Sequence, residues 1–175
     1  MPDNVSILQA LSDEQILQTR DVMRQLRPAI AADAYLPTIR RMMQSDGYHL
    51  AAVLENGEVR AVAGYRFMEM LYCGRILYVD DLNTDQQSRS AGYGKLLLDW
   101  LKQQATAHHC GELHLDSGVQ RESAHRFYFR ERLTVTAYHF RVALPPTTSP
   151  GHNQTAHSPG ETPAPPASAD NTSST

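Results

Sequence analysis

The chain has 175 residues, of which 41% are apolar and 20% are charged, so it is long enough and apolar enough for one ordinary soluble domain. Its net charge of -3 provides no broad cationic surface, which argues against DNA or another long phosphate backbone as a partner. No run of about 18 apolar residues and no secretion signal is visible, so we expect no membrane contact and a cytoplasmic location.

The composition changes abruptly at Pro145. From there to Thr175 the chain consists mainly of Pro, Ser, Thr, Ala and Gly, with almost no large apolar residue. Such a segment buries too little apolar surface to offset the entropy cost of ordering it. We therefore expect residues 1–144 to form the folded domain and residues 145–175 to be a disordered tail.

The first part of the folded region is typical of one strand followed by two helices. Ser12 and Gln15 form a capping box, in which each side chain pairs with the other residue's backbone amide at a helix start. Pro37 must lie in the first turn of the second helix or kink it, because proline has no amide hydrogen. We expect a strand at 4–8 and helices at 12–26 and 33–44.

Strand signals dominate the middle of the chain. Asn56-Gly57 is a two-residue turn that tolerates positive φ, and strand-like runs flank it, so a hairpin is expected there. The turn at Cys73-Gly74 leads into a further strand. We expect these strands at 49–55, 58–70 and 75–82.

Helices and strands alternate in the last part of the folded region. Apolar residues from Leu97 to Ala105 recur at helical spacing, and Ala124, Phe127 and Tyr128 share one face of a second helix. The order of elements predicts a mixed sheet flanked by helices rather than a doubly wound sheet. Strands are expected at 113–116 and, where Tyr138, Phe140, Val142 and Leu144 alternate, at 138–144.

The stretch from Arg89 to Lys95 lies between an expected strand and an expected helix. Gly92 and Gly94 allow the backbone to approach a ligand, and amides at a helix start are unpaired at the positive end of the helix dipole. This indicates a small phosphate ligand such as a diphosphate. A Walker loop would need glycine in place of Arg89 and Ser or Thr in place of Leu96, which disfavours ATP. The alternative is that the glycines only shape a tight turn.

Arg89-Ser90-Ala91-Gly92-Tyr93-Gly94 matches the pattern Arg/Gln-x-x-Gly-x-Gly/Ala at every fixed position. With the strand before it, the helix after it and the later Ala124-x-x-x-Tyr128, residues 4–144 resemble the GNAT superfamily of acyl-CoA N-acyltransferases. The resemblance implies an α+β fold, with a mixed, mostly antiparallel sheet of six to seven strands flanked by about four helices. It also implies an N-acetyltransferase that moves the acetyl group of its cosubstrate acetyl-CoA to a primary amine. We expect direct attack in a ternary complex, because no acyl-cysteine nucleophile is evident.

The resemblance places the cosubstrate along a strand end and the loop after it. In the family the strand end is separated from its neighbour by a bulge, so its free backbone groups pair with the pantetheine arm. An amide there would also polarise the thioester carbonyl as it becomes an oxyanion. The expected cosubstrate-binding residues are Leu82, Asn83, Thr84, Arg89, Ser90, Ala91, Gly92, Tyr93, Gly94 and Lys95.

Two side chains are candidates for proton transfer. The resemblance implies Tyr128 as the acid that protonates the departing thiolate and Asp80 as the base that takes a proton from the amine. Asp80 and Asp81 are neighbours on an expected strand, so we expect them to point to opposite faces, with one facing the cleft. The alternatives are a core tyrosine and two acids that face solvent or bind arginine and backbone groups.

The chain departs from the family pattern at three places. Thr84 stands where the family usually has an aliphatic residue, and Arg121 stands where many relatives have Asn. Arg132-Leu133 replaces the usual Gly-Phe after the last helix, which costs roughly 1 kcal/mol if the left-handed conformation is kept.

The cysteines and histidines do not show metal-ligand spacing. Cys73 and Cys110 are each followed by glycine, form no CxxC pair and are expected to be free thiols in turns. The adjacent pair His108-His109 points in different directions on a helix, and we expect no metal. His139 is either a cleft residue or a satisfied core histidine.

Other functions stay open at this point. A non-catalytic acyl-CoA-binding regulatory module would keep the loop from Arg89 to Gly94 but need neither Asp80 nor Tyr128. A nucleotide-binding module is a third class. The acceptor is either a small-molecule amine or a protein amine, with several aspartates favouring a cationic small molecule, and a homodimer is left open.

Overall fold

The computed structural model describes residues 4–144. Residues up to His139 form one compact unit, and the described residues 140–144 belong to a second unit. The expected tail, 145–175, lies outside the described residues.

Five strands form one sheet in the described part of the chain, in the order β1-β2-β3-β4-β5. β1 to β4 pair antiparallel, and β4 pairs with β5 in parallel. This confirms the expected α+β class with a mixed, mostly antiparallel sheet, at five described strands rather than six or seven. The strands are β1 Val5–Gln9, β2 His49–Glu55, β3 Glu58–Met70, β4 Gly74–Thr84 and β5 Glu112–Leu115.

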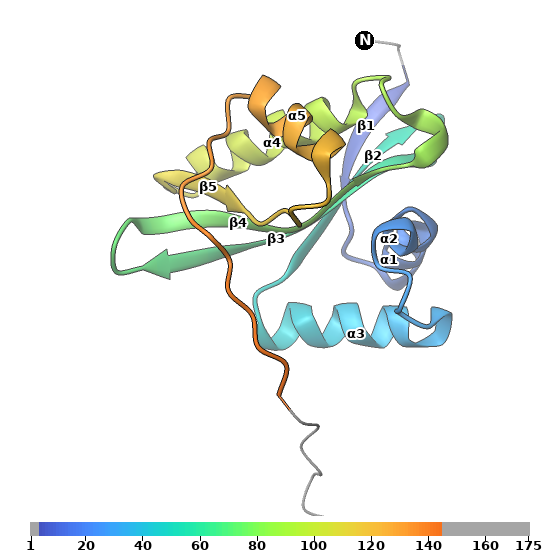
Figure 1. Cartoon of the computed structure of the whole chain (residues 1–175). Coiled ribbons are helices and arrows are strands. Elements are labelled where there is room, and N and C mark those ends of the chain that lie inside the picture. The colour runs from blue at the N-terminus through green and yellow to red at the C-terminus, as the bar shows by residue number, and fades with distance from the viewer. Residues whose placement is uncertain (1–3, 145–175) are drawn as a thin grey trace, which may run out of the picture. The chain divides into compact units, whose positions relative to one another are not determined.

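Helices cover both faces of this sheet (Figure 1). The first three helices enclose one buried cluster with β2 and β3, and α4 packs over a second cluster on the opposite face. α5 lies beside α4. The helices are α1 Asp13–Gln18, α2 Arg20–Leu26, α3 Ala32–Ser45, α4 Tyr93–Ala107 and α5 Glu122–Arg130, with a short 3-10 turn, η1, at Gln86–Ser88.

The region expected as one helix from 12 to 26 is divided into α1 and α2 at Thr19. The capping box of Ser12 and Gln15 is confirmed at its start. The buried Thr19 hydroxyl donates to the Ile16 carbonyl at 2.6 Å and lies 2.8 Å from the Tyr35 hydroxyl. A threonine that bonds to the preceding turn competes with the regular helical ladder, which accounts for the break.

Two further local expectations have different outcomes. Asn56 and Gly57 join β2 to β3 with φ of 52° and 81°, which confirms the hairpin. Pro37 lies in the second turn of α3, so of the two alternatives given above, a first-turn position or a kink, the first-turn position is wrong.

The expected final strand at 138–144 is wrong. Residues 134–144 lie outside every helix and strand of the described chain. Val135 and Tyr138 are 75% and 86% exposed. Alternating apolar residues alone do not make a strand, because strand formation also depends on a neighbouring edge that pairs with the backbone.

Candidate active site

β4 has a bulge on the side that pairs with β3 and, from about the same position onward, an open edge on the side of β5. Gly64 of β3 pairs with Asp81 and Tyr65 pairs with Val79, so Asp80 is an extra residue without a counterpart. On its other side β4 pairs with β5 only as far as Val79 and Leu115. Beyond these residues, β4 has no strand neighbour on that side within the described chain.

The expected pantetheine segment, Leu82 to Thr84, lies on this open edge. The Asp85 amide donates to the Arg60 carbonyl at 2.8 Å, so it faces β3. Backbone groups alternate along a strand, which turns those of Asn83 toward β3 and those of Leu82 and Thr84 toward the open side. Two residues of the expected segment thus offer backbone groups at an unpaired edge.

The Asn83 side chain has a structural contact that the sequence did not reveal. It is buried, and its Nδ2 donates to the Val22 carbonyl of α2 at 2.9 Å. This bond holds the end of β4 against α2. Asn83 therefore contributes to the position of the open edge through its side chain.

The glycine-containing loop leads directly from this edge into α4. Gly92 is the N-terminal cap of α4 with φ of 92°, and Ser90 also has a positive φ of 66°. No acceptor is found for the amides from Arg89 to Lys95 within residues 4–144. They lie at the positive end of a 15-residue helix, an arrangement that suits an anion.

Gly94 is required by a close contact. A Cβ atom at this position would lie 2.9 Å from Oγ1 of Thr84 and 3.7 Å from the Phe127 ring. The absence of a side chain therefore lets the first turn of α4 approach the end of β4. At Gly92 a Cβ would meet nothing within 4 Å, so there the requirement is the left-handed backbone.

Side chains that the sequence did not single out hold the loop to α2. Gln25 donates through Nε2 to Asp85 at 2.8 Å and accepts from the Gln86 amide at 3.0 Å. Ser88 also donates to Asp85, at 3.2 Å. These bonds, with that of Gln25 first, lower the pKa of Asp85. The loop before the amides is thus anchored at both ends of η1.

Tyr93 and Lys95, in the second half of the loop, already have side-chain partners. The Tyr93 hydroxyl donates to Glu55 at 2.5 Å. Lys95 pairs with Asp99 at 2.6 Å and with Glu131 at 3.2 Å. Arg89 is exposed. Any anion at this loop therefore meets mainly backbone amides, with Arg89 as the nearby exposed cation.

Asp80 and Asp81 lie on the same face of the sheet, so the expectation of opposite faces is wrong. Asp81 accepts from Arg27 at 2.7 Å and from the Tyr48 hydroxyl at 2.9 Å. Asp80 accepts two bonds from Arg66, at 2.9 and 2.6 Å. The bulge explains the result, because the extra residue interrupts the regular alternation along β4.

Tyr48 is buried beneath the two acids. Burial, followed by the charge of Asp81, raises its pKa well above the ordinary value, so it remains a hydrogen-bond donor. A Cβ at Gly64 would lie 1.8 Å from the Tyr48 hydroxyl oxygen. Gly64 thus leaves the space in which the phenol reaches Asp81.

A pocket of about 230 Å³ opens above these acids on the side of α2 and α3. Its walls are mostly apolar, and its acidic residues are matched by arginines. The lining residues are Met23, Arg27, Ile30, Tyr35, Thr38, Ile39, Met42, Tyr48, Asp80 and Asp81.

Tyr128 lies on α5, which contacts α4. Lys102 donates to the Glu131 carbonyl at 3.3 Å, and Phe127 lies against Gly94. Burial raises the pKa of Tyr128, and the positive charge of Arg121 opposes that rise. No hydrogen-bond partner of its hydroxyl is found among the described residues.

The segment after β5 contributes Asp116, which was expected only as one of several aspartates, and Ser117, which sequence reasoning missed. Asp116 accepts from the Tyr78 hydroxyl at 2.6 Å and pairs with His139 at 2.8 Å. His139 is 65% exposed, so it is not a core histidine. The buried Ser117 hydroxyl has no partner among the described residues. The sequence signal that could have indicated Asp116 and Ser117 is that both lie at the carboxyl end of an expected strand.

A model of the Acetyltransferase (GNAT) family matches residues 14–133, which is more than half of the chain. The chain belongs to the GNAT family. It is therefore an enzyme, a GNAT superfamily N-acetyltransferase. Membership implies that it acts on an acceptor amine, but it does not specify which kind of amine.

A curated relative agrees with this membership, and two solved structures share the fold. The GNAT chain is 34% identical over 138 residues to the uncharacterized N-acetyltransferase YhdJ of Bacillus subtilis (strain 168), covering 78% of this chain and 97% of that protein. An acetyltransferase of Trypanosoma brucei has a TM-score of 0.67 at 19% identity, over 81% of this chain and all of that one. The aminoglycoside N-acetyltransferase AAC(6')-Iy, in complex with CoA, has a TM-score of 0.69 at 16% identity, over 85% and 99%.

Within residues 4–144 of this GNAT enzyme, no helix has the length and apolar character needed to cross a membrane.

Proposed function

We propose that this enzyme transfers the acetyl group of acetyl-CoA to the primary amine of a small molecule, by direct attack in a ternary complex. The observation that carries the proposal is the continuity between the open edge of β4 and the unpaired amides at the start of α4. Coenzyme A has an extended pantetheine arm followed by a diphosphate, which matches a strand edge followed by a group of free amides.

The pantetheine arm would lie along β4 as an added strand. Its amides and carbonyls would pair with the outward backbone groups of Leu82 and Thr84. The diphosphate would then reach the amides between Arg89 and Lys95, where the helix dipole stabilises its charge. The orphaned Ser117 hydroxyl, just beyond the last residue of β5, supports a polar ligand between the two separated strands.

Tyr128 would donate a proton to the departing thiolate. Because burial raises the pKa of its phenol, Tyr128 holds its proton at neutral pH, as an acid must. The free hydroxyl has no competing partner in residues 4–144. Phe127, the preceding residue on α5, lies against Gly94 close to Thr84, which puts α5 beside the proposed course of the pantetheine arm.

Asp80 would accept the amine proton, directly or through one water. Arg66 occupies one lone pair of each carboxylate oxygen, and each oxygen keeps a further lone pair for an ammonium or water hydrogen. The residue lies in the pocket wall at the bulge, beside the open edge. Arg66 would thus hold the carboxylate in place while it accepts the proton.

The pocket favours an amine with an apolar body. Asp80 and Asp81 are paired with Arg66 and Arg27, so their charges do not give the pocket a net negative charge. Apolar side chains from α2 and α3 form most of the remaining wall. A small amine carried on an aliphatic or aromatic group would bury apolar surface there.

Direct attack is supported by the positions of the cysteines. Cys73 precedes the first residue of β4, at the opposite end of that strand from Thr84. Cys110 lies before β5, and burial raises the pKa of its thiol, which disfavours the nucleophilic thiolate. Neither cysteine is suited to carry the acetyl group.

The test is a panel of small amines assayed by release of free thiol from acetyl-CoA. We expect turnover with amines that carry apolar groups, and initial-rate plots that intersect when both substrates are varied. Parallel plots would contradict the ternary complex. Absence of thiol release with every amine, despite acetyl-CoA binding, would favour a regulatory acyl-CoA-binding module.

A further inference from the structure

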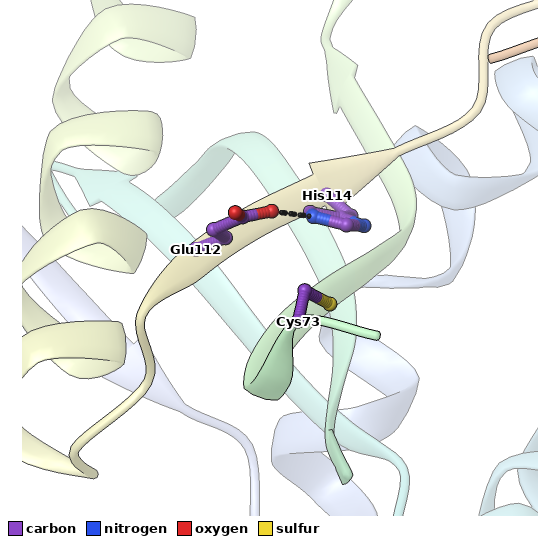
Figure 2. Close-up of side chains that lie close together, drawn as sticks. All are labelled: Cys73, Glu112 and His114. Atoms are coloured by element: carbon purple, nitrogen blue, oxygen red, sulfur yellow. Dashed lines mark hydrogen bonds and ion pairs between the residues drawn. The ribbon is translucent and has the colours of Figure 1, made fainter. Parts of the chain in front are cut away.

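Three side chains of the kinds that bind transition metals meet at the end of the sheet where β4 and β5 begin. Glu112 and His114 are two residues apart on β5, so both point from the same face of that strand. Cys73 reaches the same place from the turn between β3 and β4. Figure 2 shows the three side chains gathered there, with the Glu112–His114 contact marked.

The ligand atoms are close enough to share one ion. The Cys73 sulfur, a Glu112 oxygen and a His114 nitrogen all lie within 4.8 Å of one another. Nε2 of His114 and Oε2 of Glu112 are 2.5 Å apart. Around a tetrahedral zinc ion such atoms would be separated by about 3.3–3.6 Å, so adjustments of about 1 Å bring the set to that geometry.

We infer that Cys73, Glu112 and His114 form a binding site for Zn²⁺. Thiolate, imidazole and carboxylate are the three donor types that zinc accepts, and magnesium or calcium would instead require an oxygen-only set. Three protein ligands leave the fourth tetrahedral position for water.

The fold brings the ligands together before any ion binds. β4 and β5 pair in parallel from Ile76 and Glu112 onward, which fixes Glu112 and His114 beside the start of β4. Glu112 is 54% exposed and His114 is 22% exposed, so ion entry requires little desolvation of buried groups. The sequence did not reveal the site because β4, η1 and α4 lie between Cys73 and the Glu-x-His pair.

The bound ion would clip the β3–β4 turn to β5. Only four residue pairs join β5 to β4. A metal bridge where the two strands begin would strengthen this short pairing, whose other end borders the open edge of β4. β4 has 11 residues, which places Thr84 on the order of 30 Å from Cys73. The ion therefore lies away from the proposed acetyl-transfer site, and this inference does not depend on that proposal.

The experiment is a titration of the metal-free full-length chain with Zn²⁺ alone, and separately with Co²⁺, which takes the same donors and reports a thiolate bond through its absorption. We expect one ion per chain and a cobalt–thiolate band. Cys73→Ser and His114→Gln should each weaken Zn²⁺ binding by at least about tenfold and remove or alter the band.

Cys110→Ser is the matched control, because it removes the second free cysteine and leaves the trio intact. It should retain the stoichiometry, the affinity and the band. The melting temperature without metal should be similar for the parent and all three variants, and Zn²⁺ should raise it in the parent and in Cys110→Ser only. Unchanged Zn²⁺ binding in Cys73→Ser, or no one-to-one binding by the parent, would overturn the inference.

Discussion

Tyr128 is half-buried and its hydroxyl has no partner among the described residues, and both properties matter for an acid. Its raised pKa means that the protonated form persists through neutral pH. A reaction that needs this proton is therefore retained at lower pH and lost as the pH rises through the raised pKa.

We expect Tyr128→Phe to lower kcat by roughly 10² or more while the affinity for acetyl-CoA changes little, because only the proton donor is removed. Comparison of kcat across pH checks the assignment. The alkaline decline of the parent should be absent in the variant. A variant with parental kcat would show that Tyr128 only packs beside Phe127.

The ion pair of Asp80 and Arg66 either serves catalysis, with Asp80 as the base, or only stabilises the fold, and two variants distinguish these roles. If Asp80 is the base, Asp80→Asn should lower kcat by roughly 10² or more, because shape is kept and the proton acceptor is lost. Arg66→Gln should keep measurable turnover. Kinetics and thermal melting of both variants distinguish this from a structural pair, for which both changes would lower stability alike and leave kcat near the parental value.

Gly94 and Thr84 offer a test of how the loop meets β4. Gly94→Ala places a methyl group 2.9 Å from Oγ1 of Thr84, so the start of α4 must shift and the affinity for acetyl-CoA should fall by roughly tenfold. Adding Thr84→Ala removes that oxygen and should restore most of the affinity. Calorimetric titration of the two single variants and the double variant measures the coupling, and additive effects would contradict it.

At the scale of elements, α5 ends in a left-handed residue that is not glycine. Arg132 has φ of 66°, and the Leu133 amide donates to the Tyr128 carbonyl at 3.0 Å, the closing bond of a common helix end. The chain thus keeps the conformation that the replaced family glycine would favour.

Arg132→Gly should raise the free energy of unfolding by about 1 kcal/mol, because glycine adopts this conformation without strain. Urea unfolding of the parent and the variant measures the difference. Arg126→Gly is the contrasting change, since it introduces glycine at an exposed position inside α5 and should destabilise the protein by a similar amount. A destabilised Arg132→Gly protein would contradict the strain argument.

Elements with local signals could be predicted from the sequence. The hairpin follows from Asn56-Gly57, the first helix start from its capping box, and the loop before α4 from its two glycines. Each of these signals lies within a few residues of the feature that it specifies.

Features that depend on distant partners could not be predicted. The shared face of Asp80 and Asp81 results from a bulge that is defined only by the register with β3. Arg27 and Asp81 pair across 54 residues of sequence. Alternation at 138–144 carried no information on whether an edge was present to receive that segment.

At the scale of the whole molecule, cosubstrate binding should stabilise the folded chain. Acetyl-CoA at 100 times its Kd adds about 2.7 kcal/mol to the free energy of unfolding if it binds only the native state. Pantetheine lacks the diphosphate and should give a much smaller rise in melting temperature at the same concentration. Equal shifts from both compounds, or none from acetyl-CoA, would contradict a diphosphate site at the loop.

The opening beside β4 also has a consequence for how the protein meets its own copies. An unpaired strand edge accepts any extended backbone, including that of another molecule of the same chain. The bulge limits this hazard, because the available stretch is short and twisted and α4 begins at its end. A bound cosubstrate would occupy this edge and prevent another chain from pairing with it. The enzyme without cosubstrate is therefore the form that is most exposed to edge-to-edge association.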